Sequence, residues 1–302
     1  MTLVLLFLIM NLGAGAASDS KPGEALNVIA SGGTPDVVLI PGLSGCAYGF
    51  RHVLPLVEAA GLSWVVIEPL AIGGSPRPAQ ADYSLTAQAD RVAAVLDRFE
   101  AGPVVVLGHG VSASIALRLA LRRPDLVQAV VSVEGAAIEN AATPTVERSL
   151  KWAALAAKFG GGRILRDRFK SDMEDASGDR SWVTGYTVRK YFAHANRDLP
   201  AAIAALRAMA RAEEPQTLRD KLAQIPCPVL LMLGGAPHAC AVSPDEEALL
   251  REGLRGFACQ TVPGAGHFIF EEQPTVVATA IIRLATTEMS VSTQQGSLLC
   301  VQ

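Results

Sequence analysis

The stretch VVVLGHGVSASIALRLA (residues 104–120) decides how this chain folds. It opens with β-branched residues, breaks at Gly108 and Gly110, and continues with helical periodicity. β-Branched residues favour strands, whereas glycine permits the left-handed backbone that a sharp reversal needs. We therefore predict a buried strand over 103–108, a tight turn at Gly110 and a helix over 111–122.

Apolar runs separated by helical segments recur on both sides of this stretch. Strands that are apolar on both faces and joined by helices are typical of a buried parallel sheet. The expected strands are 36–42, 63–69, 129–135, 228–235 and 259–267, and the expected helices are 47–60, 84–100, 244–254 and 274–286. We predict one α/β core made of residues 25–139 and 223–288, with a mostly parallel central sheet flanked by helices.

The interval 140–222 shows helical stretches without strand signals, interrupted by glycine-rich FGGG (159–162) and polar DASGD (175–179). We predict a helical cap inserted between two strands of the core. Its aromatic residues either line a pocket beneath the cap or simply pack within it. The polar segment 289–302 is expected to be a flexible tail.

The N-terminus carries the apolar run LVLLFLIM (3–10), followed by the small residues AGAAS (14–18). This order predicts a secretory signal peptide over 1–17, and hence a periplasmic or secreted protein. If it is cleaved, no stable membrane association is expected. If it is retained, the segment acts as a membrane anchor.

The composition bounds the remaining classes of function. The chain has 302 residues, is 50% hydrophobic and carries a net charge of −3, so one sizeable core is expected. Its basic residues are scattered, which argues against a nucleic-acid partner. Its five cysteines show no metal-ligand spacing, and no loop is suited to cradling phosphate, so neither a metal nor a cofactor is implied. Cys227 and Cys259 either form a disulfide or remain two buried thiols.

Four loops together resemble those of the α/β-hydrolase superfamily, and specifically its capped small-molecule hydrolases. They are LIPGLSG (39–45), EPLAIGGSP (68–76), VVVLGHGVSA (104–113) and VPGAGHFIFEEQP (262–274). The resemblance implies an α/β-hydrolase fold with a cap. It makes Gly110 the position of the nucleophile at a strand-to-helix elbow.

The same resemblance implies roles for three further positions. The backbone amides of Leu43 and Val111 would form the oxyanion hole, and His267 would be the general base. Each of these groups would act on a carbonyl compound bound above the elbow.

Two departures from the family pattern bear on the chemistry. Gly110 offers no hydroxyl, and Ser112 is either a substitute nucleophile or a small packing residue of the helix. The segment Gly235 to His238 lacks the acid expected there. Glu134, at the end of strand 129–135, either supplies that acid or is a strand-end carboxylate bound to local amides.

Two functions remain open for this small-molecule site. In the first, His267 and Glu134 activate water or transfer a proton to hydrolyse an ester or lactone without a serine nucleophile. In the second, the chain binds a small molecule without turnover. A purely structural or partner-binding role is a third alternative, and the sequence does not fix the oligomeric state.

Overall fold

The central feature of the computed structural model is a seven-stranded sheet with the order β1-β3-β2-β4-β5-β6-β7. The model describes residues 23–140, 150 and 161–286. All neighbouring strands are parallel except β1, which pairs antiparallel with β3. The strands are β1 (Asn27–Ala30), β2 (Val37–Ile40), β3 (Trp64–Glu68), β4 (Val104–His109), β5 (Val127–Val133), β6 (Val229–Gly234) and β7 (Phe257–Val262). The predicted fold class is confirmed, whereas β1 was not expected.

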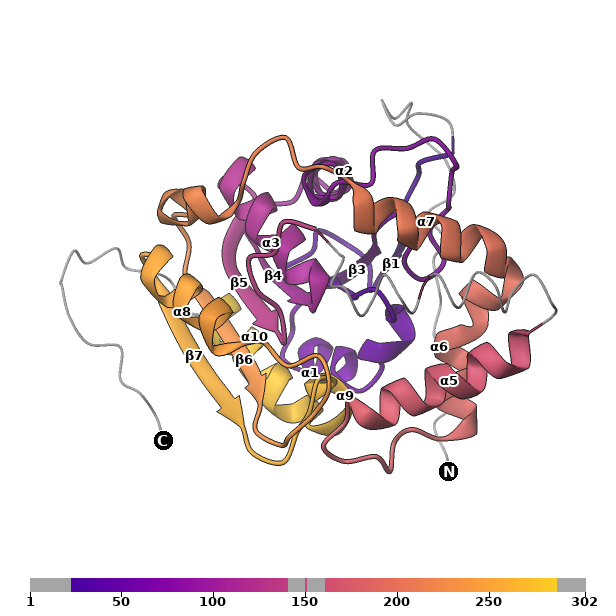
Figure 1. Ribbon diagram of the computed structural model, residues 1–302. Coiled ribbons are helices and arrows are strands. Elements are labelled where there is room, and N and C mark those ends of the chain that lie inside the picture. Colours follow the sequence, from indigo (N-terminus) through magenta and orange to yellow (C-terminus); the bar gives the residue numbers. More distant parts are fainter. Residues whose placement is uncertain (1–22, 141–149, 151–160, 287–302) are drawn as a thin grey trace, which may run out of the picture.

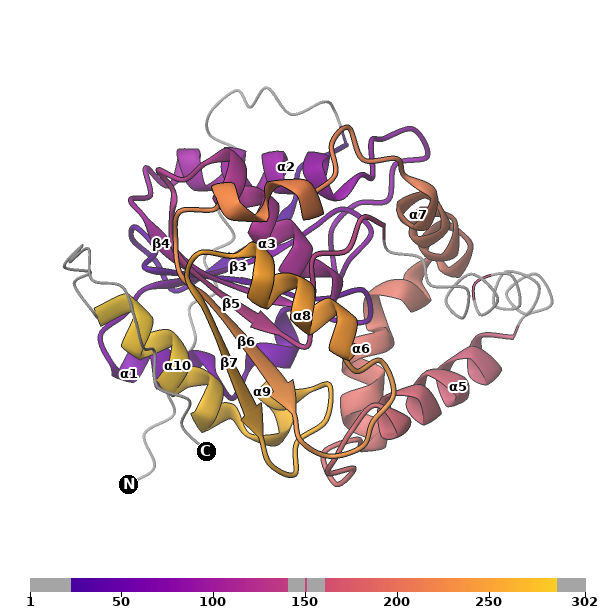
Figure 2. The same cartoon turned by 60° about the vertical axis from the view of Figure 1, so that its left-hand side comes forward.

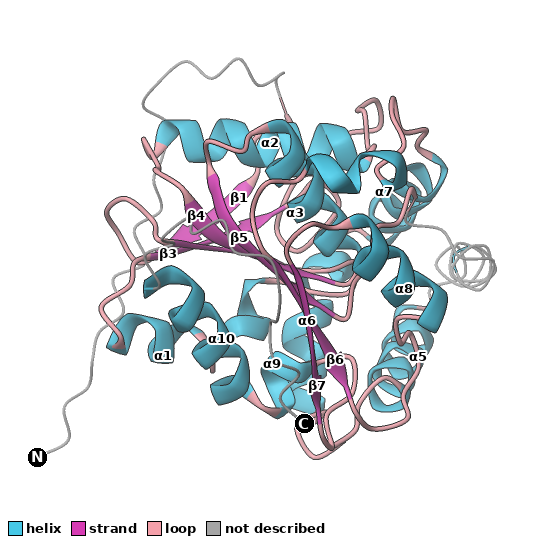
Figure 3. Ribbon diagram, turned by 90° about the vertical axis from the view of Figure 1, so that its left-hand side faces the viewer, coloured by secondary structure: helices cyan, strands magenta, loops and turns pink. Residues whose placement is uncertain are grey.

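Helices cover both faces of the sheet, which is why its inner strands are apolar on both sides. One face carries α2 (Leu85–Arg98), α3 (Val111–Arg122) and α8 (Pro244–Gly253), and the opposite face carries α1 (Leu54–Ala59) and α10 (Pro274–Thr286). Figure 3 shows these two layers, and Figure 2 shows α1 and α10 side by side. Two hydrophobic cores result, one on each face of the sheet.

Local signals explain where several helices begin. Ser84 caps α2 by accepting a hydrogen bond from the backbone of Ala87, and Ser243 forms a capping box with Glu246 at the start of α8. The single helix expected over 47–60 is wrong, because the segment divides into the short helix η1 (Ala47–Phe50) and α1. The break lies just before Pro55, which is tolerated in the first turn of a helix but not in its interior.

The described part of the segment between β5 and β6 contains helices and no strand. These are α5 (Gly162–Asp175), α6 (Gly185–Arg197), α7 (Leu199–Arg211) and η2 (Arg219–Gln224). In Figure 1, α5, α6 and α7 gather on the right of the sheet. Helix α6 packs on the core where the ring of Tyr191 meets Tyr48 at a centroid distance of 6.0 Å. The extent of the cap at 140–222 remains a prediction.

The predicted signal peptide and the predicted flexible tail lie outside the described residues. Within the described ranges, no helix is both long and apolar enough to cross a membrane.

The register of β6 and β7 rules out the bridge considered between Cys227 and Cys259. Cys259 lies opposite Leu231, whereas Cys227 precedes the first paired residue of β6. At about 3.3 Å per residue, this offset of four positions separates the two cysteines by roughly 13 Å along the strands. Cys227 is a buried thiol outside any disulfide.

Candidate active site

Gly110 forms the turn between β4 and α3, as expected. Its dihedral angles, φ 54° and ψ −123°, lie in a region that residues with a Cβ rarely adopt. Its N–H donates to the carbonyl of Val133 at 2.9 Å, and its carbonyl accepts from the N–H of Ala113 at 3.0 Å. Glycine therefore makes the sharp bend without strain while presenting no side chain to the site.

The missing side chain of Gly110 would face His267. A Cβ built on Gly110 would lie 3.6 Å from Nε2 and 3.7 Å from Cε1 of His267, with no other atom of the described residues within 4 Å. The structure thus brings together the elbow position and the histidine that the family resemblance paired as nucleophile position and general base. Next to Nε2 of His267 it leaves a space where the family pattern has a hydroxyl.

His267 is held by main-chain bonds on both sides. Its N–H donates to the carbonyl of Ala176, at the end of α5, at 2.8 Å, and its carbonyl accepts from Nε2 of His109 at 3.1 Å. Its ring packs against those of His109 and Phe268, with centroid distances of 4.5 and 5.3 Å. The loop of His267 is therefore anchored to both β4 and α5, the first helix described between β5 and β6.

Burial sets the protonation state of both histidines. It lowers the pKa of His267 well below its usual value, and the neighbouring His109 and His238 lower it further. Burial also lowers the pKa of His109 to about 4. Both imidazoles are therefore neutral at pH 7, and Nε2 of His267 has a free lone pair when the proton sits on Nδ1.

Glu134 directly follows β5 and has a left-handed backbone (φ 47°), which is uncommon for a residue with a Cβ. Its side chain is 1% exposed. The carboxylate accepts from the N–H of Gly234 and, at 3.4 Å, from the N–H of Val242. Burial raises the pKa of Glu134, and the bond from Gly234 opposes that rise. The structure records no hydrogen bond between this carboxylate and His267, although a ligand atom of each lies within 4.8 Å of the other.

His238 occupies the place of the absent acid, and sequence reasoning missed it as a site residue. Its side chain is 2% exposed, and its Nε2 lies 3.4 Å from Oε2 of Glu134. Its Nδ1 lies 2.7 Å from the carbonyl of Ala236, so Nδ1 carries the proton that is donated. The available signal was its position, since it stands where the family pattern has a carboxylate that faces the catalytic histidine.

Ser112 lies on the side of α3 that packs against the sheet. Its side chain is fully buried, and its hydroxyl donates to the carbonyl of Pro41 at 2.7 Å. In this structure the hydroxyl of Ser112 is therefore bound to the main chain beneath the elbow. Val111 begins α3 directly after the elbow, and Leu43 lies in a turn closed by a bond from Gly45 to Gly42 at 2.8 Å.

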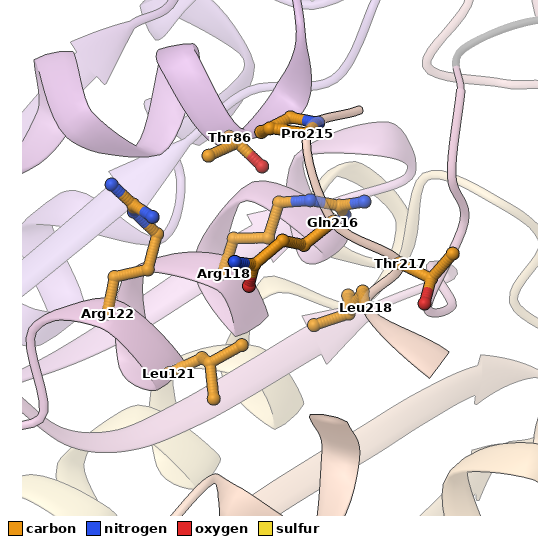
Figure 4. A pocket seen from close by; sticks show the side chains of 8 residues that line it. All are labelled: Thr86, Arg118, Leu121, Arg122, Pro215, Gln216, Thr217 and Leu218. Atoms are coloured by element: carbon orange, nitrogen blue, oxygen red, sulfur yellow. The ribbon is translucent and has the colours of Figure 1, made fainter. Parts of the chain in front are cut away.

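A small pocket lies elsewhere, beside the second half of α3 (Figure 4). Residues 215–218 and Arg118 contribute to its lining, and none of the predicted site residues does. The guanidinium of Arg118 is already paired with the carboxylates of Glu139 and Glu214. This arginine is therefore not available to bind an anionic ligand.

Comparisons with known proteins agree with this architecture. A model of the alpha/beta hydrolase family matches residues 37–280. The sn-1-specific diacylglycerol lipase ABHD11 of Mus musculus is 25% identical over 251 residues, which cover 80% of this chain and 77% of that protein.

Two solved structures share the fold. A thermophilic esterase from Thermogutta terrifontis superposes with a TM-score of 0.71 at 18% identity, covering 89% of this chain and 97% of that one. Est816, an enzyme that degrades N-acyl homoserine lactones, gives 0.64 at 20% identity, covering 84% and 95%. Because the family model spans the sheet from β2 to β7 and both loops that meet at Gly110 and His267, the chain belongs to the alpha/beta hydrolase family.

Proposed function

We propose that this protein hydrolyses small esters or lactones with water as the nucleophile and His267 as the proton acceptor. The observation that carries the proposal is the open side-chain position of Gly110, 3.6 Å from Nε2 of His267. A water molecule at this position replaces the hydroxyl of the family pattern. It requires no covalent intermediate.

The reaction proceeds in two steps. Nε2 of His267 takes a proton from the water while its oxygen attacks the carbonyl carbon, and the amides of Leu43 and Val111 stabilise the resulting oxyanion. The tetrahedral intermediate then expels the alkoxide, which receives the proton from Nε2. The products are a carboxylic acid and an alcohol, or a hydroxy acid from a lactone. A positioned general base contributes roughly 10²–10⁴-fold.

The choice of substrate class rests on the relatives. The names of the similar proteins include a diacylglycerol lipase, an esterase and a lactone-degrading enzyme. All three names refer to compounds that contain an ester or lactone group. Near His267, Trp182 packs on Phe268 with ring centroids 5.1 Å apart, which places aromatic surface beside the site.

The proposal is tested with a panel of esters and lactones and with hydrolysis in ¹⁸O-labelled water. We expect slow, pH-dependent turnover that His267→Gln abolishes and His194→Gln preserves, because His194 lies on α6 and outside the site. A single turnover should place ¹⁸O directly in the acid product. Full turnover in His267→Gln, or no turnover of any substrate, overturns the proposal.

A second candidate function is binding of a small molecule without turnover. It is favoured by Glu134, whose carboxylate is held by the amides of Gly234 and Val242 and makes no recorded hydrogen bond to His267. A catalytic histidine whose ring has no hydrogen-bonded acid partner is a poor catalyst. Ligands that raise the melting temperature but are recovered unchanged would support binding alone.

A further inference from the structure

Glu134, His238 and His267 form a cluster of metal-ligand type. Each offers one ligand atom, and these atoms all lie within 4.8 Å of one another. No cysteine pair or metal-ligand motif in the sequence indicates this cluster, because its members lie after three different strands, β5, β6 and β7. Only the fold brings them together.

The proton on His238 makes this cluster unusual. Because Nδ1 donates its proton to the carbonyl of Ala236, Nε2 of the neutral ring carries a lone pair and can only accept. This lone pair lies 3.4 Å from Oε2 of Glu134, which also can only accept when ionised. Nε2 of His238 and Nδ1 of His267 are both buried without a hydrogen-bond partner. In that state Nε2 of His238 and Oε2 of Glu134 are two buried acceptors that face one another, which is costly unless a proton or a metal cation lies between them.

We propose that Glu134, His238 and His267 bind one divalent transition-metal ion of the zinc type. Two imidazoles and one carboxylate are the ligand set of several catalytic zinc sites. Ligands about 2.05 Å from a tetrahedral ion lie roughly 3.3 Å apart, close to the 3.4 Å between His238 and Glu134. His267 completes the site through Nδ1, since its Nε2 faces Gly110. The ligand atoms need to approach by no more than about 1.5 Å.

Metal binding would change the chemistry of His267, a consequence that rests on the proposed function. When Nδ1 gives its lone pair to the ion, the proton of the neutral ring resides on Nε2. Nε2 can then donate a hydrogen bond but cannot accept a proton from water. We therefore expect the ion to suppress hydrolysis, so that the site works as an inhibitory metal switch.

The direct test is a titration of tag-free, chelator-treated protein with Co²⁺, followed by displacement of Co²⁺ by Zn²⁺. We expect saturable binding of one ion per chain with visible d–d absorption, and a melting temperature that rises with the concentration c of free ion, because the ion stabilises the folded state by RT ln(1 + c/Kd). His238→Gln and Glu134→Gln should each weaken binding by more than about 100-fold, because even partners outside the ligand set cost 10–100-fold.

Two controls guard against adventitious binding. His194→Gln removes a histidine outside the cluster, and Cys240→Ser removes an exposed thiol on the same loop as His238. Both variants should retain wild-type affinity. Three outcomes would overturn the proposal. The first is loss of binding in Cys240→Ser alone, and the second is the absence of saturable binding. The third is equal binding by His238→Gln and wild type when circular dichroism shows that both are folded.

The tests of the metal site and of the proposed hydrolysis can fail independently of each other. Saturable binding by a protein that hydrolyses nothing upholds the metal site and removes the proposed function. Hydrolysis by a protein that binds no metal ion upholds the proposed function and removes the metal site. Hydrolysis that persists at saturating Zn²⁺ contradicts the proposal that the ion inhibits, but it upholds the metal site itself.

Discussion

Nε2 of His109 donates a hydrogen bond of 3.1 Å to the main-chain carbonyl of His267. The bond joins the last residue of β4 to a loop 158 residues later in the chain. It fixes the backbone of His267 directly beside the elbow. Because the donor ring is buried and neutral, the same contact gives this part of the fold a pH dependence.

We expect His109 to make the protein less stable in acid. Its pKa is about 4 in the folded protein and 6.5 when exposed, so between these values the unfolded chain binds the proton that the folded chain excludes. The free energy of unfolding therefore falls as the pH drops through this window, by up to about 3 kcal/mol. Urea denaturation of wild type and His109→Gln from pH 7 to 4 should show a smaller fall in the variant. Parallel curves would contradict the assignment.

Gly110→Ser should lower the stability of the protein and add a reactive hydroxyl to the site. A side chain at φ 54° costs about 1–3 kcal/mol, so the melting temperature should fall. The new hydroxyl would lie beside Nε2 of His267, and a fluorophosphonate probe should phosphonylate it with release of fluoride, whereas wild type should not react. Gly110→Ala should be destabilised similarly without labelling.

Gly102→Ala is the matched control for that strain. Gly102 has an ordinary φ, and a Cβ built there meets no atom of the described residues within 4 Å. Its free energy of unfolding should stay within about 0.5 kcal/mol of wild type. If Gly102→Ala and Gly110→Ala lose equal free energy of unfolding, backbone strain at residue 110 is not the cause of the loss.

Tyr191 should stabilise the contact of α6 with the core. Its hydroxyl donates to Oε1 of Glu271 at 2.5 Å, and the same oxygen accepts from Arg51 at 2.5 Å. The Glu271 side chain is fully buried, so removal of one donor in Tyr191→Phe should lower the free energy of unfolding by about 1.5–3 kcal/mol. Tyr186→Phe, at a residue 54% exposed on the same helix, should change it by less than 0.5 kcal/mol. Similar losses in both variants would refute the contact's importance.

The central strands could be predicted because they depend on local sequence. Val104 to Leu107 are β-branched or aliphatic and fully buried, and glycine ends the run. The strand β1 could not be predicted, since it is four partly buried residues at a sheet edge without a distinct alternation. The break at Pro55 was visible in the sequence, but the apolar periodicity around it favoured one helix.

The candidate site was predictable only where it follows from strand ends. The carboxyl ends of parallel strands lie at one edge of the sheet, so the loops after β4 and β7 share that edge, and the family resemblance paired Gly110 with His267. The partners of Glu134 were not predictable, because they depend on the path of the loop after β6 and on side-chain rotamers. That loop brings the amide of Val242 and the ring of His238 to a carboxylate more than a hundred residues earlier.

Arg118 should be the most costly arginine of α3 to replace. It is 2% exposed and pairs with Glu139, just after β5, at 2.7 Å and with Glu214, just after α7, at 3.2 Å. These carboxylates lie where the chain leaves the sheet and where it returns, so one guanidinium ties both connections to the core. Arg118→Met leaves both carboxylates without their cation and should cost about 3–5 kcal/mol of unfolding free energy.

One turn later on the same helix, Arg122 pairs with Asp90 at the surface, where both side chains are more than 40% exposed. Water screens this pair, so Arg122→Met should cost less than about 1 kcal/mol in the same urea denaturation series. Glu214→Gln combined with Arg118→Met should cost less than the sum of the two single variants, because the second change removes a charge that the first leaves unpaired. Strict additivity, or equal losses at the two arginines, would show that the network does not hold the two connections.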